Sequence, residues 1–223
     1  MNVFRSFREI FRQDNWSQAT TGRVGEMLDL CVAMNRFVYR VLIEGLPHDA
    51  AQAELYDRDK RVNVLEREVR RSVVTHLALG QGSGDIPSGL IFMNAVKDAE
   101  RIGDYIKNIY DVARELMPET ADRGLYKAKL KVFADPMRDL MLETADVFSR
   151  SDEQAARRIL DLVRVEEKAL EAAIKDITRS DLKTSDAVCL VLVMRFYKRI
   201  FSHLSNIAST VCLPVDRMDF FDE

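Results

Sequence analysis

Apolar side chains spaced by three and four residues form two aligned runs in this sequence, and this repeat constrains the fold more than any other feature. Such spacing predicts a helix with one buried face, and we call each run a seam. The second seam lies 98 residues after the first without a gap, which indicates a duplicated helical unit. A charged residue found in one copy alone is therefore not needed for the shared fold. The first seam is Phe92, Ala95, Ala99, Ile102, Ile106, Ile109 and Ala113, and the second is Leu190, Val193, Tyr197, Ile200, Leu204, Ile207 and Val211.

The composition favours a folded chain with a substantial core. Of the 223 residues, 47% are hydrophobic, which argues against disorder. The net charge of −3 gives no sign of nucleic-acid binding, which normally needs a basic face. Cys31, Cys189 and Cys212 form an odd set with no CxxC pair, so we expect reduced thiols in a cytoplasmic protein. No apolar run approaches the length of a membrane span.

Helical periodicity extends over almost the whole chain, and no alternating strand pattern is present. Glycine and proline interrupt it at Gly45-Leu46-Pro47, at Gly80–Gly84 and at Met117-Pro118. Within the fourth helix we expect a kink or a restart at Pro136, with Asp135 as the cap. The predicted helices span 18–44, 50–79, 87–116, 124–149, 151–179 and 186–212.

We therefore predict an all-α fold made of two tandem, pseudo-repeated three-helix bundles with six long helices. Short connections favour antiparallel neighbours within each bundle. We expect the two bundles to lie end to end, which would give an elongated molecule. The predicted parts are an amphipathic N-terminal arm at 1–17, a first bundle at 18–117, a second bundle at 118–214 and an acidic tail at 215–223.

The N-terminal arm has two interpretations. Large apolar residues are interleaved with arginines between Met1 and Trp16, which makes this segment basic and amphipathic. Such a segment can lie on a membrane surface, so peripheral contact with the inner face of the membrane through residues 1–16 is one prediction. We favour the other, in which the arm packs on the bundle or on a second subunit, because short anchors bind weakly alone.

One flank of the helix at 87–116 carries an acidic pattern. Glu100 and Asp104 are about one turn apart, on an arc that we expect to face outward because the seam lies opposite. The preceding helix adds Asp59 and Glu66 beside its own apolar stripe. Carboxylates with this spacing suit hard cations, so these four residues are candidate metal ligands. The alternative is a solvated face held by local ion pairs, which is the commoner case for charged helix surfaces.

The second copy keeps the seam and loses these acids. Lys198 stands at the position of Glu100, and Ser202 stands at the position of Asp104. The carboxylates are therefore not needed for helix packing, which leaves them free for a function. We expect at most one metal cluster, on the first bundle.

The acidic stretch resembles the signature of the PhoU family, regulators of phosphate uptake built from two repeated three-helix bundles. Its motif, an acid followed after three residues by Asp, is matched by Glu100 and Asp104. The stretch from Asp59 to Glu66 resembles the partner motif on the preceding helix, with Asn63 where an acid is common. The Arg–Ile and Asn–Ile pairs of the signature occur in both copies, at Arg101 and Asn108 and at Arg199 and Asn206.

This resemblance implies a cytoplasmic, dimeric accessory protein that is not an enzyme. It implies negative regulation of phosphate-starvation genes by coupling a phosphate transporter, through its ATPase subunit, to a sensor histidine kinase. Members of the family can carry multinuclear metal clusters, so a divalent or ferric ion is implied for the first bundle, with its identity open. The acids of the second signature are replaced, so no cluster is expected there.

Two other functions are alternatives to this regulatory role. A metal-dependent enzyme is disfavoured because no histidine follows a glutamate at the spacing that bundle di-iron sites use: Gly45, Val73 and Ile200 stand three residues before the three histidines. The remaining alternative is a membrane-surface or transporter-associated helical scaffold that binds no metal.

Overall fold

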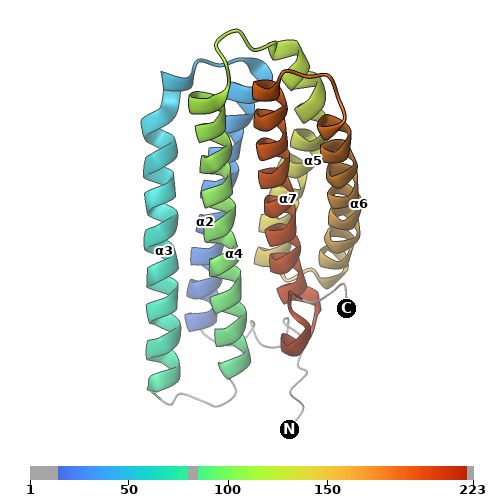
Figure 1. Cartoon of the computed structure of the whole chain (residues 1–223). Helices are drawn as coiled ribbons and strands as arrows, with labels where there is room; N and C mark the ends of the chain where they lie inside the picture. The colour runs from blue at the N-terminus through green and yellow to red at the C-terminus, as the bar shows by residue number, and fades with distance from the viewer. Residues whose placement is uncertain (1–14, 80–84, 220–223) are drawn as a thin grey trace.

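A computed structural model describes residues 15–79 and 85–219 of the chain (Figure 1). Over these two ranges the chain forms six long α-helices and no strand, so the predicted all-α class is confirmed. Two π-helical segments, η1 (Arg40–Glu44) and η4 (Val112–Leu116), follow α2 and α4, and two short 3-10 helices are η2 (His48–Ala51) and η5 (Val215–Arg217). The long helices are α2 (Asn15–Tyr39), α3 (Gln52–Ala78), α4 (Ile86–Asp111), α5 (Arg123–Arg150), α6 (Glu153–Thr178) and α7 (Thr184–Cys212).

Local sequence explains where most of these helices begin and end. Gly45 has a φ of 78°, a left-handed conformation that glycine adopts readily, and it closes η1 as the sequence predicts. Asp122 caps α5 by accepting hydrogen bonds from two backbone N–H groups, and Asp152 caps α6 by accepting one from Ala155. The predicted helix limits are accurate to within a few residues once the π segments are counted with their helices.

The predicted restart of the fourth helix at Pro136 is wrong. Helix α5 is continuous from Arg123 to Arg150 with Pro136 inside it. Asp135 does not cap a new helix: its Oδ1 accepts a hydrogen bond from the Tyr39 hydroxyl at 2.7 Å, and its Oδ2 accepts one from Lys131. The carboxylate therefore joins α5 to α2, and the packing of these helices compensates for the hydrogen bond that proline cannot donate.

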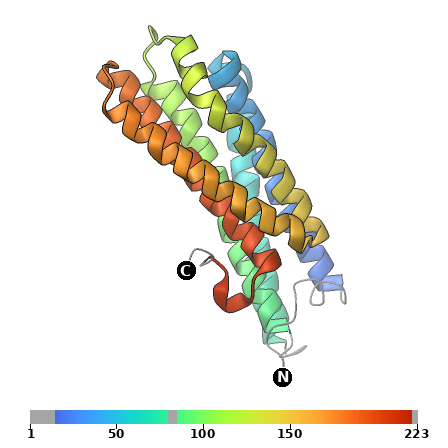
Figure 2. The same ribbon diagram turned by 90° about the vertical axis from the view of Figure 1, so that its right-hand side faces the viewer.

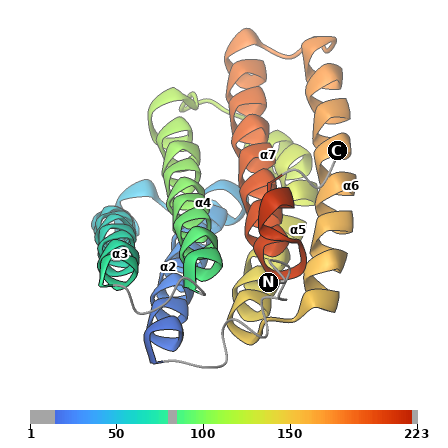
Figure 3. The ribbon, with the colours of Figure 1, turned by 90° about the horizontal axis from the view of Figure 1, so that it is seen from below.

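The two bundles lie side by side, so the predicted end-to-end arrangement is wrong. Helices α2, α3 and α4 pack on one another, as do α5, α6 and α7. Helix α4 also packs along α7 and α2 along α5, and seen from below the two groups adjoin along these four helices (Figure 3). The helices run nearly the full length of the molecule, as the side view shows (Figure 2).

Both seams are buried, as predicted. Each of their residues belongs to one hydrophobic core that runs through both bundles. The limits of two separate domains, 18–117 and 118–214, stay a prediction because this core is continuous. Burial of two aliphatic seams on adjacent helices is the main force holding the bundles together.

Most of the N-terminal arm lies outside the described residues, so its two interpretations stay predictions. At the other end, part of the predicted acidic tail packs on the protein: Met218 is buried, and the Asp219 backbone N–H donates to Ser209 Oγ at 3.2 Å. Among the described helices, none combines the length and the apolar character that a membrane crossing requires.

Candidate functional site

The four predicted metal ligands come together between α3 and α4. We call Asp59, Glu66, Glu100 and Asp104 the carboxylate cluster. Their side chains keep between 12% and 28% of their exposure, so the predicted outward orientation is wrong. Packing of α3 against α4 covers the flank of α4 that the sequence left open, and burial makes these charges costly unless they are paired.

A lysine on α4 lies between two of the carboxylates. Lys107 Nζ donates to Asp59 Oδ2 at 3.0 Å and to Asp104 Oδ1 at 3.2 Å, and its side chain is 25% exposed. Burial lowers the pKa of Lys107, but its hydrogen bonds to the two carboxylates outweigh that effect and raise it overall. The ammonium is therefore held as a cation at the centre of this part of the cluster.

Two arginines pair with one oxygen each of Asp104, Glu100 and Glu66. Arg101 lies 3.3 Å from Asp104 Oδ2 and 3.6 Å from Glu100 Oε2, and Arg70 lies 2.7 Å from Glu66 Oε1. Every carboxylate of the cluster thus has a basic partner within the described residues. One negative charge remains in excess over the three basic side chains.

Glu100 bears the excess charge. Burial raises its pKa above the ordinary value, and the neighbouring carboxylates of Asp104 and Glu66 raise it further, while Arg101 opposes the shift. The carboxyl group of Glu100 therefore binds a proton more readily than a glutamate in water. Since the carboxylates of Glu66 on α3 and Glu100 on α4 repel each other, the cluster favours a proton on Glu100.

Within the described residues, no group of three or more His, Cys, Asp or Glu side chains is placed so that it could hold a metal ion. The predicted ligand set therefore stays a prediction, and so does the identity of an ion. The donor chemistry does not fit a bridging metal between Asp59 and Asp104, because Lys107 already occupies the bridging position.

The signature residues have different environments in the two copies. Arg101 and Arg199 are exposed, and Asn108 is half-buried. Asn206 instead donates from Nδ2 to Asp98 Oδ1 at 3.2 Å, across the contact between α7 and α4. The signature asparagine of the second copy is therefore a structural contact between the bundles.

A buried polar group between the bundles was missed by the sequence analysis. Asp98 is fully buried, and its Oδ1 accepts a hydrogen bond from His203 Nδ1 at 2.7 Å. The side chain of His203 keeps 17% of its exposure. The repeat offered a signal for this contact: it aligns the polar residues Asp98 and His203 with the aromatic residues Phe196 and Tyr105 of the other copy.

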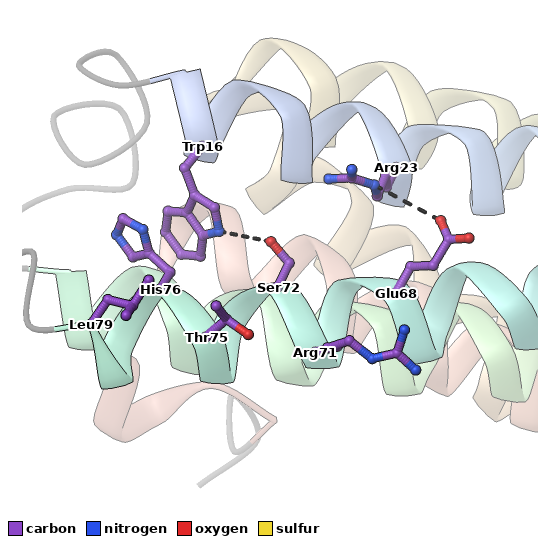
Figure 4. Close-up of a pocket in the computed structure, with 8 residues that line it drawn as sticks. All are labelled: Trp16, Arg23, Glu68, Arg71, Ser72, Thr75, His76 and Leu79. Atoms are coloured by element: carbon purple, nitrogen blue, oxygen red, sulfur yellow. Dashed lines mark hydrogen bonds and ion pairs between the residues drawn. The ribbon is translucent and has the colours of Figure 1, made fainter.

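A separate open pocket of about 440 Å³ lies between the start of α2 and the end of α3 (Figure 4). Trp16 enters it from α2, donates its indole N–H to Ser72 Oγ at 2.9 Å and stacks on His76 with 3.8 Å between ring centroids. His76 Nε2 also lies 2.9 Å from Asp85 Oδ2. The histidine is thus held by two structural contacts, which leaves it poorly placed to act as a free base.

Comparison with known proteins gives one family. Residues 24–113 match the family model described as the PhoU domain. Two proteins of Xylella fastidiosa, from strains 9a5c and Temecula1, are each 25% identical to this chain over 173 residues. The match covers 73% of this chain and 70% and 69% of those proteins, and each is named phosphate-specific transport system accessory protein PhoU homolog.

The fold has a counterpart among solved structures. The crystal structure of PhoU from Pseudomonas aeruginosa is similar with a TM-score of 0.75 and 19% sequence identity. The likeness covers 88% of this chain and 95% of that chain. At this identity the structural match establishes the fold alone. The family match over 24–113 includes the carboxylate cluster and stops before the second bundle.

Proposed function

We propose, because this chain belongs to the PhoU family, that it is a regulatory accessory protein of phosphate uptake and phosphate-starvation signalling and not an enzyme. The observation that carries the proposal is the match of 24–113 to the PhoU domain, joined to a two-bundle fold that extends over both halves of the chain. The names of the Xylella fastidiosa relatives support a role beside a phosphate transport system.

The proposed mode of action is binding to another protein. The partner is the ATPase subunit of a phosphate transporter, a sensor histidine kinase, or both in turn, and the protein works as a cytoplasmic homodimer that represses phosphate-starvation genes. Chemistry on a small substrate is not needed for this role.

A basic surface on α3 is the part of the described structure best suited to such a partner. Arg67 and Arg71 are exposed, and within the described residues neither is part of an ion pair. Arg71 lies beside the pocket that contains Trp16 (Figure 4). An acidic surface on the partner would gain ion pairs here without breaking any that the described residues form.

Deletion of the gene, with a phosphate-starvation reporter measured in high phosphate, tests the proposal. We expect derepression in the deletion strain and repression when the wild-type chain is restored. The variant Arg67→Glu/Arg71→Glu should restore repression less well, and it should bind the purified ATPase subunit or kinase more weakly. Lys127→Glu/Lys129→Glu, on exposed positions of α5, is the matched control for charge.

Two results together would contradict the proposal. These are an unchanged reporter in the deletion strain and no binding to the ATPase subunit or the kinase in either low or high phosphate. Binding to liposomes that requires residues 1–16, without any effect on the reporter, would favour the membrane-surface scaffold instead.

A further inference from the structure

The central contact of the carboxylate cluster has the geometry of a cation bridge. Lys107 Nζ lies 3.0 Å from Asp59 on α3 and 3.2 Å from Asp104 on α4, so one positive charge links two helices. In a protein that used a hard metal ion here, the same two carboxylates would face the ion with their oxygens free. In this chain an ammonium group that is covalently part of α4 takes that place.

The second oxygen of Asp104 is also engaged. Asp104 presents Oδ1 to Lys107 and Oδ2 to Arg101, which is 3.3 Å away. A metal ion bound by Asp59 and Asp104 would therefore have to displace the ammonium and accept a nearby positive charge. Two like charges a few ångströms apart repel strongly in a partly buried site. The pairing of the side chains thus works against metal binding at this position.

The second copy of the repeat supports treating these residues as one unit. The 98-residue offset aligns Asp104 with Ser202 and Lys107 with Ser205. The acid and its lysine are therefore present together in one copy and absent together in the other. Both seams are buried although only the first copy has this lysine, so helix packing alone does not explain why the lysine and the acid occur in the same copy.

We propose that the ammonium of Lys107 replaces a bridging metal ion in the carboxylate cluster, so that the first bundle is complete without metal. The bridge stabilises the packing of α3 on α4 by charge-assisted hydrogen bonds to a buried and a half-buried aspartate. This inference concerns the chemistry of the cluster and does not depend on the regulatory role, so either one can fail while the other stands.

Mn²⁺ alone is the probe for the test, added to the full-length chain after removal of metal with a chelator. Titration calorimetry and thermal unfolding should show no Mn²⁺ binding to the cluster of the wild-type chain. Lys107→Gln frees one oxygen of each aspartate and removes the central positive charge, so it should gain a Mn²⁺ site at least about tenfold tighter than any in the wild type. Added Mn²⁺ should also raise the unfolding temperature of this variant.

Two control variants locate the gained site. Lys107→Gln/Asp59→Asn should lose it, because the site then keeps a single aspartate of the bridge. Lys129→Gln removes a positive charge from an exposed position of α5 and should gain no site. A gain in both lysine variants would mean that net charge, and not the vacated bridge, attracts the ion, and this would overturn the proposal.

The wild-type chain also tests the proposal if Lys107→Gln does not fold. Mn²⁺ binding to the wild type that is lost in Asp59→Asn and in Asp104→Asn would show that metal and lysine share the cluster, and the proposal would be wrong. A folded Lys107→Gln that gains no Mn²⁺ site would contradict it equally. Wild-type binding that both aspartate variants retain lies elsewhere and leaves the assignment of the bridge intact.

Discussion

Where α4 has Gly103, the equivalent position of α7 has Phe201, and the two bundles fill this point of the repeat in different ways. A Cβ at Gly103 would lie 3.6 Å from Cys31 Sγ on α2 and 3.8 Å from Val62 Cγ1 on α3. The ring of Phe201 is itself fully buried. Neighbouring helices thus supply the packing in the first bundle, and α7 supplies its own in the second.

Helices α4 and α7 touch at two points that the repeat makes equivalent, and the side chains differ between these two points. His203 Nδ1 lies 2.7 Å from the buried Asp98, whereas the equivalent residues Tyr105 and Phe196 meet as rings with 5.9 Å between centroids. The repeat therefore gives α4 and α7 two equivalent contacts, of which one is polar and the other is aromatic. The duplicated seam fixes where the helices meet, and the residues beside it decide the chemistry of each meeting point.

Replacement of Phe201 should have the largest effect on stability. Phe201→Ala leaves a cavity in the second bundle, and we expect the free energy of unfolding to fall by about 3–5 kcal/mol. In contrast, Gly103→Ala places its methyl group at ordinary contact distances and improves helix propensity, so it should stabilise the chain by up to about 1 kcal/mol. Urea denaturation of both variants measures the difference. A strongly destabilised Gly103→Ala would show that the first bundle needs a closer approach of its helices.

Loss of the polar contact should have the next largest effect. Asp98→Ala removes the acceptor of both His203 and Asn206, and we expect a cost of up to about 3 kcal/mol because these two half-buried polar groups lose their shared partner. Phe196→Ala, at the equivalent half-buried position, should cost about 1–2 kcal/mol.

Asp98→Asn is the control for shape, since the amide keeps one acceptor oxygen for His203. It should cost less than Asp98→Ala in the same denaturation series. Equal stability of Asp98→Ala and the wild-type chain would mean that the polar contact adds nothing to the joining of the bundles, and the aromatic contact would then be the stronger of the two.

The smallest effects concern two glutamates, one in each bundle, whose pKa values shift in opposite directions. Burial, with Asp104 and Glu66 nearby, raises the pKa of Glu100 above its ordinary value of 4.5. The hydrogen bond from Lys198 lowers the pKa of Glu171 below that value. Glu100 therefore contributes stability below pH 4.5 that is lost as the pH rises through its raised pKa. Glu171 contributes stability above pH 4.5 that is lost as the pH falls through its lowered pKa.

Thermal unfolding across this pH range should separate the two glutamates. At neutral pH, Glu100→Gln should raise the unfolding temperature slightly, because it removes an unfavourable charge, and Glu171→Gln should lower it slightly. Both differences should shrink in acid as the wild-type carboxylates take up protons. A lowered unfolding temperature for Glu100→Gln at neutral pH would show that the surroundings of Glu100 are not net acidic.

The candidate site could be predicted in part. The acids Glu100 and Asp104 and their partners on α3 followed from spacing and resemblance, and the structure brings all four together. Lys107 was not predicted as the bridge, because its reach to Asp59 depends on how α3 packs on α4 across 48 residues of sequence. The burial of the cluster was missed for the same reason.

The sequence by itself determined the six helices, their approximate ends and the seams, because helical periodicity and glycine and proline stops act within a few residues along the chain. Tertiary structure alone decided that the bundles lie side by side, that α5 stays continuous through Pro136 and that Asp98 meets His203. These contacts join residues far apart in the sequence, and their geometry depends on which helix faces pack together, which no local pattern specifies.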